Sequence, residues 1–425
     1  MPGEPSRAPA VIDCAPSHAR DVEVLRDLAR QVRALATSDR MSESRNLWRD
    51  HNSLLRSRVP VYMRWFATAH EIVDPHLACE DPLLRGHERR LRQLVFQGWL
   101  EDDYTIEPWH VVGARRVLPE DGPWGVSPTR THSSDAGGAW KEIAPLQDES
   151  DFDRLVTPRH VIDEEATARD AERLHDAIGD ILPIVVDRAP AWMMWRGDLS
   201  TDIAHLRGLE QIMWDMYDNP AFLHRLLAFM RDGVLAAHEQ AEAAGDFRLI
   251  DHQNQSMPYA RELPDPSPSE DPVPRSRLWG YMAAQEYTLI SPELTDEFML
   301  QYQIPILERF GLSAYGCCEK MDAKISLARK IPNLRRVAVT PSSDPATCAE
   351  QIGTDYVASW RPNPAETVCC GFDADRIRTI VREAREAFDA NGTVFDVCLK
   401  DIQTVEHQPE RLRDFVRIVR EVCDD

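Results

Sequence analysis

Apolar residues follow a helical spacing in the first quarter of the chain. Leucine, valine and alanine recur three and four positions apart within residues 21–58 and again within 81–100, which predicts amphipathic helices. Residues 1–20 are rich in proline, alanine and arginine and lack this spacing, so they are predicted to form a flexible arm. The chain is therefore expected to open with an arm followed by helices.

From about residue 180 onward, short strand-like runs alternate with helical stretches. The β-branched run at 181–186 has the composition of a buried parallel strand. Further strand-like runs lie at 248–251, 312–317, 336–339, 356–360 and 393–399. Parallel neighbours need crossover connections, and the helical stretches between these runs supply them. We therefore predict an α/β fold, a (β/α)8 TIM barrel with an N-terminal helical extension.

The predicted organisation has three parts. Residues 1–20 form the arm, residues 21–180 the helical extension with the first barrel elements, and residues 181–425 the remainder of the barrel. The proline-rich stretch 258–276 is interpreted as a long active-face loop or lid, because it is expected to lie between a strand and its following helix.

Charge and cysteine content narrow the class of protein. The chain has 71 acidic against 49 basic residues, a net charge of −22, which excludes a generic nucleic-acid binder. It shows neither a membrane-spanning apolar run nor a secretory signal, so a cytoplasmic location without membrane contact is expected. The adjacent cysteines at 317–318 and 369–370 are poorly placed for ordinary disulfides, and reduced thiols are expected.

The carboxyl ends of the predicted strands carry the candidate chemistry, because barrel enzymes place their reacting groups there. Cys317 and Cys398 end different strands, and thiolates with imidazole or carboxylate around an open position describe a catalytic zinc site. Cys318, Glu319 and His252 are the further ligand candidates. The alternative is that each cysteine is simply a core residue, since free cysteine is among the most buried residue types.

Other strand ends offer acid–base and binding groups. Asp251 and His252 would suit proton transfer or substrate hydrogen bonding, although an aspartate there could equally cap a loop. The chain has no glycine-rich phosphate loop, no dinucleotide-binding fingerprint and no nucleophile elbow. Kinase, dehydrogenase and serine-hydrolase functions therefore lack support.

Several of these residues resemble motifs of the uroporphyrinogen decarboxylase superfamily. Ser291, Pro292 and Glu293, followed by Glu297–Phe298 and Tyr302, are similar to that family's "SPE…EF…PY" helix. The similarity covers residues 180–425 well and the N-terminal third weakly.

A second group of residues resembles the methyltransferase branch of this superfamily. Tyr315, Gly316 and Cys317 are similar to its zinc-binding His-x-Cys, and Cys398 stands where the branch has its last zinc-ligating cysteine. The turn that begins at Arg361 also matches.

This resemblance implies a zinc-dependent methyltransferase. It would move a methyl group from a methylated or methoxylated small molecule to a corrinoid protein, whose cobalamin docks at the barrel mouth, or to a thiol acceptor. Zinc would be held by Cys317 and Cys398 with Cys318 or Glu319, and Asp251 and His252 would be catalytic. The implied substrate-binding residues are Gln285, Glu286, Tyr315 and Arg361.

Departures from the family pattern keep two alternatives open. Tyr315 stands where the zinc branch has histidine, so the third ligand is open among Glu319, Cys318 and His252. A metal-free decarboxylase would use Arg58 and Arg64 as a carboxylate clamp, and a catalytically silent binding barrel is the other alternative. The methyl donor, the acceptor and the oligomeric state are open, with a homodimer as one option.

Overall fold

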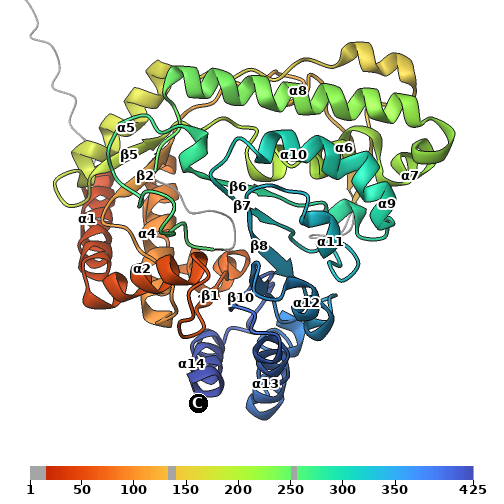
Figure 1. The fold of residues 1–425 in the computed structure, drawn as a ribbon. Coiled ribbons are helices and arrows are strands. Elements are labelled where there is room, and N and C mark those ends of the chain that lie inside the picture. Colours follow the sequence, from red (N-terminus) through yellow and green to blue (C-terminus); the bar gives the residue numbers. More distant parts are fainter. Residues whose placement is uncertain (1–15, 133–139, 250–255, 425) are drawn as a thin grey trace, which may run out of the picture.

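The computed structural model describes residues 16–132, 140–249 and 256–424. Three helices form the N-terminal extension: α1 (Pro16–Ala36), α2 (Asp39–Asn52) and α4 (Pro82–Leu100). They lie together beside the barrel, with α1 against α4 (Figure 1). The predicted N-terminal helices are confirmed, and α1 already begins within the stretch that the sequence indicated as a flexible arm.

Parallel strands form the barrel. Six of them make one sheet in the order β1-β10-β9-β8-β7-β6, and β2 pairs with β5 in a separate parallel sheet. The strands are β1 (Val61–Met63), β2 (His110–Gly113), β5 (Ile184–Asp187), β6 (Trp279–Met282), β7 (Leu312–Tyr315), β8 (Leu334–Val339), β9 (Val357–Trp360) and β10 (Phe395–Leu399). The six-stranded sheet curls like half a barrel (Figure 1), which confirms a mixed α/β, TIM-barrel-like fold.

Helices surround the strands of the two barrel sheets. They are α5 (Glu164–Ile178), α6 (Ser200–Arg207), α7 (Leu209–Asp218), α8 (Pro220–Ala244), α9 (Pro292–Thr295), α10 (Gln301–Leu307), α11 (Ile325–Ala328), α12 (Pro345–Ile352), α13 (Ala374–Ala390) and α14 (Glu410–Asp424). A π-helical turn, Asp296–Leu300, joins α9 to α10. The short helix α3 (Ala69–Ile72) follows β1, and an antiparallel hairpin is formed by β3 (Thr129–His132) and β4 (Trp140–Ile143).

The barrel contains β6, a strand that the sequence pattern did not indicate, whereas a strand was expected at 248–251. Residues 248–249 have irregular backbone, and 250–251 lie outside the described residues, whereas β6, which the pattern did not indicate, supplies the barrel strand. The proline-rich loop 258–276 therefore leads into β6. β6 is short and contains Gly280, which weakens its strand signal. A Cβ at Gly280 would meet the Phe310 ring at 3.0 Å, so packing explains the glycine.

Alternate residues of β10 face opposite sides of the sheet. Val397 and Leu399 belong to the outer core beneath the helices, whereas Cys398 packs in the cluster that contains Tyr62 of the neighbouring strand. Because side chains alternate along a strand, Asp396 lies on the same face as Cys398. The inner face of β10 thus carries Asp396 and Cys398.

An ion-pair network fills the amino-terminal end of the barrel interior. Arg336 donates to Asp396 Oδ2 at 2.6 Å and to Asn52 Oδ1 at 2.7 Å, and His51 Nε2 lies 2.9 Å from the same carboxylate. All four residues are at most 2% exposed. The network ties α2 to β8 and β10, and it neutralises a carboxylate that would otherwise be buried without a partner.

Removing one member of this network should destabilise the fold. We expect Arg336→Met to lower the free energy of unfolding by about 3–5 kcal/mol, because the buried Asp396 carboxylate would lose its guanidinium partner and keep only the contacts with His51 and Ser359. The matched control is Arg329→Met, whose ion pair with Asp355 is exposed and should contribute less than about 1 kcal/mol. Urea unfolding measures both, and equal effects of the two substitutions would contradict the assignment.

Candidate functional site

Two adjacent thiols lie at the carboxyl-end face of the barrel, here called the mouth. Cys317 and Cys318 follow β7, and a turn at Gly316 with φ of +100° directs the chain to them. A Cβ at Gly316 would approach the Cβ of Ala338 to 2.9 Å, so both backbone conformation and space favour glycine here. The local sequence therefore turns both cysteines onto the mouth.

A buried lysine contacts both sulfurs. The two Sγ atoms are 3.4 Å apart, and Lys400 Nζ lies 3.5 Å from Cys317 Sγ and 3.1 Å from Cys318 Sγ. Lys400, which follows β10, is only 4% exposed and also pairs with Asp401 at 2.7 Å. Cys317 is 2% exposed, whereas Cys318 is open to solvent. One thiol is thus enclosed and the other accessible.

The surroundings of Cys317 favour its thiolate form. The hydrogen bond from Cys318 lowers the pKa of Cys317 to about 6, and the positive charges of Arg361 and Lys400 act in the same direction against the effect of burial. The pKa of Cys318 is raised by the same hydrogen bond and by burial. At neutral pH the pair therefore carries one negative charge, centred on Cys317.

Arg361 is placed beside the thiolate by the backbone. Its buried guanidinium donates to the carbonyl oxygens of Gly316, at 3.3 Å, and of Cys317. It is 3% exposed, and burial is offset by neighbouring negative charge, so the pKa of Arg361 is raised and the group stays charged. This predicted substrate-binding residue lies at the mouth, where it holds the turn that presents Cys317.

Glu319 braces the same turn. Its Oε1 accepts from the backbone N–H of Ala284 at 2.8 Å and its Oε2 from that of Cys317 at 2.7 Å. The carboxylate, which is 1% exposed, thereby joins the ends of β6 and β7. Both oxygens of this predicted ligand are therefore directed at backbone amides.

The other predicted ligands do not complete a zinc site as arranged. Cys398 is fully buried, and burial raises the pKa of its thiol to about 11. Among the described residues, no group of three histidine, cysteine, aspartate or glutamate side chains is arranged to hold a metal ion. The ammonium of Lys400 lies against both sulfurs. Asp251 and His252 fall in the segment 250–255, outside the described residues.

The remaining predicted binding residues hold loops together. Gln285 donates to Glu286 at 3.1 Å, and Glu286 accepts from Ser200 Oγ at 2.5 Å and from Thr201 Oγ1 at 3.1 Å. These contacts connect the loop after β6 with the start of α6.

Tyr315 faces the outer helices. It lies in the outer core, and its hydroxyl donates to Gln303 Oε1 of α10 at 2.8 Å. Gln303 in turn donates to the carbonyl oxygens of Asp198 and Ala283, at 2.6 and 2.8 Å. Tyr315 therefore supports the loops after β5 and β6 from behind.

Asp198 is a candidate that the sequence did not indicate, because an aspartate just before a helix looks like a cap. It is fully buried, one oxygen accepts from the Thr201 N–H at 3.1 Å, and the other has no partner in the described part of the chain. Burial, aided by the charge of Glu286, raises the pKa of Asp198 well above its usual range. Two strained residues flank it, Met194 with φ of 53° and Leu199 with φ of 68°. Burial thus favours the protonated form of Asp198 on a constrained loop.

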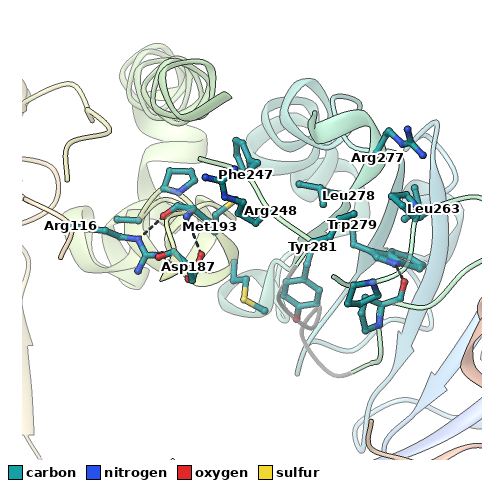
Figure 2. Close-up of a pocket in the computed structure, with 18 residues that line it drawn as sticks. Arg116, Asp187, Met193, Phe247, Arg248, Leu263, Arg277, Leu278, Trp279 and Tyr281 are labelled. Atoms are coloured by element: carbon teal, nitrogen blue, oxygen red, sulfur yellow. Dashed lines mark hydrogen bonds and ion pairs between the residues drawn. The ribbon is translucent and has the colours of Figure 1, made fainter. Parts of the chain in front are cut away.

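An apolar pocket lies where the two barrel sheets are not hydrogen-bonded to each other, between β5 and β6 (Figure 2). Its volume is about 300 Å³. Its apolar lining includes Met193, Met194, Phe247, Leu263, Leu278, Trp279 and Tyr281 together with several prolines. The ion pair of Arg116 with Asp187, at 2.7 Å, forms part of its polar wall. Such a lining suits a small, mainly apolar ligand.

The pocket and the thiolate share a wall. Tyr281 lines the pocket, packs with Cys317 in one buried cluster, and donates to the carbonyl oxygen of Gly316 at 3.1 Å. Met194 contacts the same cluster and also lines the pocket. Burial and then the charge of Cys317 raise the pKa of Tyr281 well above its usual value. A molecule in the pocket would therefore lie one side chain away from Cys317.

Comparison with known proteins supports the fold. No protein-family model matches the sequence. No curated protein matches it. Among solved structures, the chain is similar to a methyltransferase from Methanosarcina mazei, with a TM-score of 0.51 and 12% sequence identity, over 89% of this chain and 97% of that chain. At this identity the likeness concerns the fold, so membership of the uroporphyrinogen decarboxylase superfamily stays a prediction.

The search for membrane spans covered the described residues. None of the helices there combines the length and apolar character needed to cross a bilayer.

The pKa of Cys317 can be tested by substitution. Cys318→Ala should raise it toward the ordinary value of about 8.5, and Lys400→Met should raise it less, because the hydrogen bond contributes more than the charge. The measurement is the pH dependence of iodoacetamide alkylation of the tryptic peptide 310–320, with Cys370→Ala as the control. A midpoint near 6 in all three variants would contradict this account of the site.

Proposed function

We propose that this protein is a methyltransferase that takes a methyl group from a methylated or methoxylated small molecule, with its reaction centre at Cys317 and Cys318. The observation that carries the proposal is the position of the thiolate, enclosed at the mouth and separated by Tyr281 from an apolar pocket. The fold shared with a methyltransferase at 12% identity adds support at the level of architecture.

A buried thiolate suits methyl transfer on chemical grounds. A methyl carbon is displaced by a soft nucleophile, and thiolate is the strongest that side chains provide near neutral pH. If Cys317 takes the group, an S–C bond forms while the C–O or C–N bond of the donor breaks, and the leaving atom keeps the electron pair. That atom then needs a proton, and the carboxyl of Asp198 on the neighbouring loop, whose burial favours the protonated form, is the group we propose to supply it.

The pocket supplies the binding side of this proposal. Its aromatic and methionine lining would take the apolar body of a donor, and the Arg116–Asp187 pair would face a polar substituent. Enclosure would also keep water from the reacting methyl group. A methoxylated aromatic compound has this combination of a flat apolar body and a polar edge.

The position of Arg58 weakens the decarboxylase alternative. It depends on Arg58 and Arg64 as a carboxylate clamp. Arg58 precedes β1, at the opposite end of that strand from the mouth, and its guanidinium is paired with Asp103 at 2.5 and 2.9 Å. It is therefore committed to an internal ion pair away from the candidate site.

The proposal predicts activity that depends on Cys317. With cob(I)alamin as acceptor and a panel of methoxybenzoates, methylamines and methyl thioethers as donors, at least one donor should yield methylcobalamin, followed by absorbance. Cys317→Ser should reduce that rate by about 100-fold or more, as expected for a group acting on the reacting atoms.

The control in this assay is Cys370→Ser, which alters a solvent-exposed cysteine of the chain's other adjacent pair and should leave the rate unchanged. The peptide 310–320 is analysed in parallel for a methyl group on Cys317. Absence of both methylcobalamin and S-methylation across the whole panel would overturn the proposal.

Zinc and a cobalamin-carrying partner form the finer part of the proposal, which rests on the family resemblance. The described donors do not fit zinc as arranged, so no step above depends on it. Metal analysis by mass spectrometry of protein purified without chelators or a polyhistidine tag tests this part. The zinc proposal requires about one ion per chain, lost in both Cys317→Ser and Cys398→Ser. Transfer activity in zinc-free protein would refute it.

A further inference from the structure

We propose that Cys317 and Cys318 are a modification site at which a hydroperoxide is reduced and the two sulfurs become joined in a reversible disulfide. Three printed distances carry this inference: 3.4 Å between the sulfurs, and 3.5 and 3.1 Å from them to Lys400 Nζ. The sulfurs are already in contact, and one cation touches both.

The oxidation proceeds in two balanced steps. The Cys317 thiolate attacks one peroxide oxygen, so that an S–O bond forms, the O–O bond breaks and the second oxygen leaves as water after taking a proton. Cys318 then attacks the sulfur of the resulting sulfenic acid, an S–S bond forms, and the S–OH oxygen leaves as water with the proton of Cys318. Two thiols and one hydrogen peroxide thus give one disulfide and two waters.

The two cysteines are suited to different steps. Cys317 is 2% exposed, its sulfur lies 3.5 Å from Lys400 Nζ, and its carbonyl oxygen accepts from Arg361, so two cations are beside the sulfur that attacks. Cys318 is exposed and hydrogen-bonded to the same sulfur, so it is in place to close the disulfide before Cys317 is oxidised further. A sulfur beside a cation and in contact with a second thiol is the arrangement found in thiols that sense oxidants.

Adjacency makes the disulfide easy to reduce. Neighbouring Cα atoms are about 3.8 Å apart across a trans peptide, shorter than the 4.4–6.8 Å that ordinary disulfides span. The closed pair is therefore strained, and strained disulfides have more oxidising potentials and are readily reduced by thiols. The site should return to the dithiol when the oxidant is gone.

A second pair of adjacent cysteines in the chain tests whether adjacency alone makes a pair easy to oxidise. Cys369 and Cys370 are also neighbours, one buried and one exposed, in the turn before α13. In the described part of the chain, no cationic side chain is within hydrogen-bonding distance of either of their sulfurs, in contrast to Lys400 at the first pair. If adjacency alone caused oxidation, both pairs would react alike. If the cation causes it, only the first pair reacts readily.

The oxidation of the two thiols can be tested separately from its effect on activity. Loss of the thiolate would switch off the site, and this consequence rests on the proposed methyl transfer. The oxidation itself does not, because its readout is the mass of a peptide. A protein without methyltransferase activity would still show the oxidation, and an active one could fail to show it.

The experiment treats the reduced full-length protein with one equivalent of hydrogen peroxide and maps the peptides over time. We expect peptide 310–320 to lose two hydrogen masses, to regain them with dithiothreitol, and to react at least about 10-fold faster than the peptide carrying Cys369 and Cys370. In Cys318→Ser, Cys317 should instead be trapped by dimedone and proceed to the sulfinic acid. Lys400→Met should slow the first step.

Two results would overturn the proposal. One is equal oxidation of the two adjacent pairs, which would make the contact with Lys400 irrelevant. The other is sulfinic acid at Cys317 of the wild-type protein at the rate seen in Cys318→Ser, which would show that Cys318 does not close the disulfide. The comparison of the two pairs within one molecule needs no variant, so it holds even if Lys400→Met folds poorly.

Discussion

A nearly enclosed ammonium group between two sulfurs is the contact on which the candidate site depends. Burying a cation is unfavourable unless anionic partners compensate for the lost hydration. Lys400 has such partners in Asp401 and the Cys317–Cys318 pair. Cys317 is 2% exposed, so it in turn needs a cation to hold a negative charge. Each group therefore stabilises the charged form of the other.

The contact of Lys400 with Cys317 and Cys318 requires a curled sheet. In the six-stranded sheet, β7 and β10 are separated by β8 and β9, so the cysteines after β7 and the lysine after β10 are not neighbours along it. They meet because the sheet curves and brings its carboxyl ends toward a common axis. At the opposite end, Arg336 and Asp396 neutralise each other across β8 and β10. The barrel interior is thus electrically balanced at one end and arranged to hold a thiolate at the other.

Local patterns were sufficient to predict much of this fold from the sequence. The helices and most strands follow from apolar spacing, and the strand-end rule places Cys317 and Cys318 at the mouth. The pattern did not indicate β6, because Gly280 weakens its strand signal; of the strand expected at 248–251, residues 248–249 are irregular and 250–251 lie outside the described residues.

Features that depend on distant contacts could not be predicted. The Lys400 contact joins residues 82 and 83 positions apart, and the pocket combines segments from Arg116 to Tyr281. The orientation of Tyr315 toward Gln303 and the unpartnered oxygen of Asp198 likewise depend on packing between elements. Sequence spacing carries no information on these contacts, since each depends on how the helices settle on the sheet.

The nature of the cation beside the sulfurs links function to redox behaviour. In the family that the sequence resembles, positive charge at this place comes from zinc, which occupies sulfur lone pairs as it stabilises the thiolate. An ammonium stabilises the same charge through hydrogen bonds that break easily, so the sulfur stays open to attack on carbon or on oxygen. The proposed reactivity toward a methyl donor and the proposed sensitivity to peroxide would then have one cause, namely a thiolate that is held by hydrogen bonds to an ammonium. A site that gains the first property by this route also acquires the second, and an adjacent thiol that can close a reversible disulfide is the simplest protection it could have.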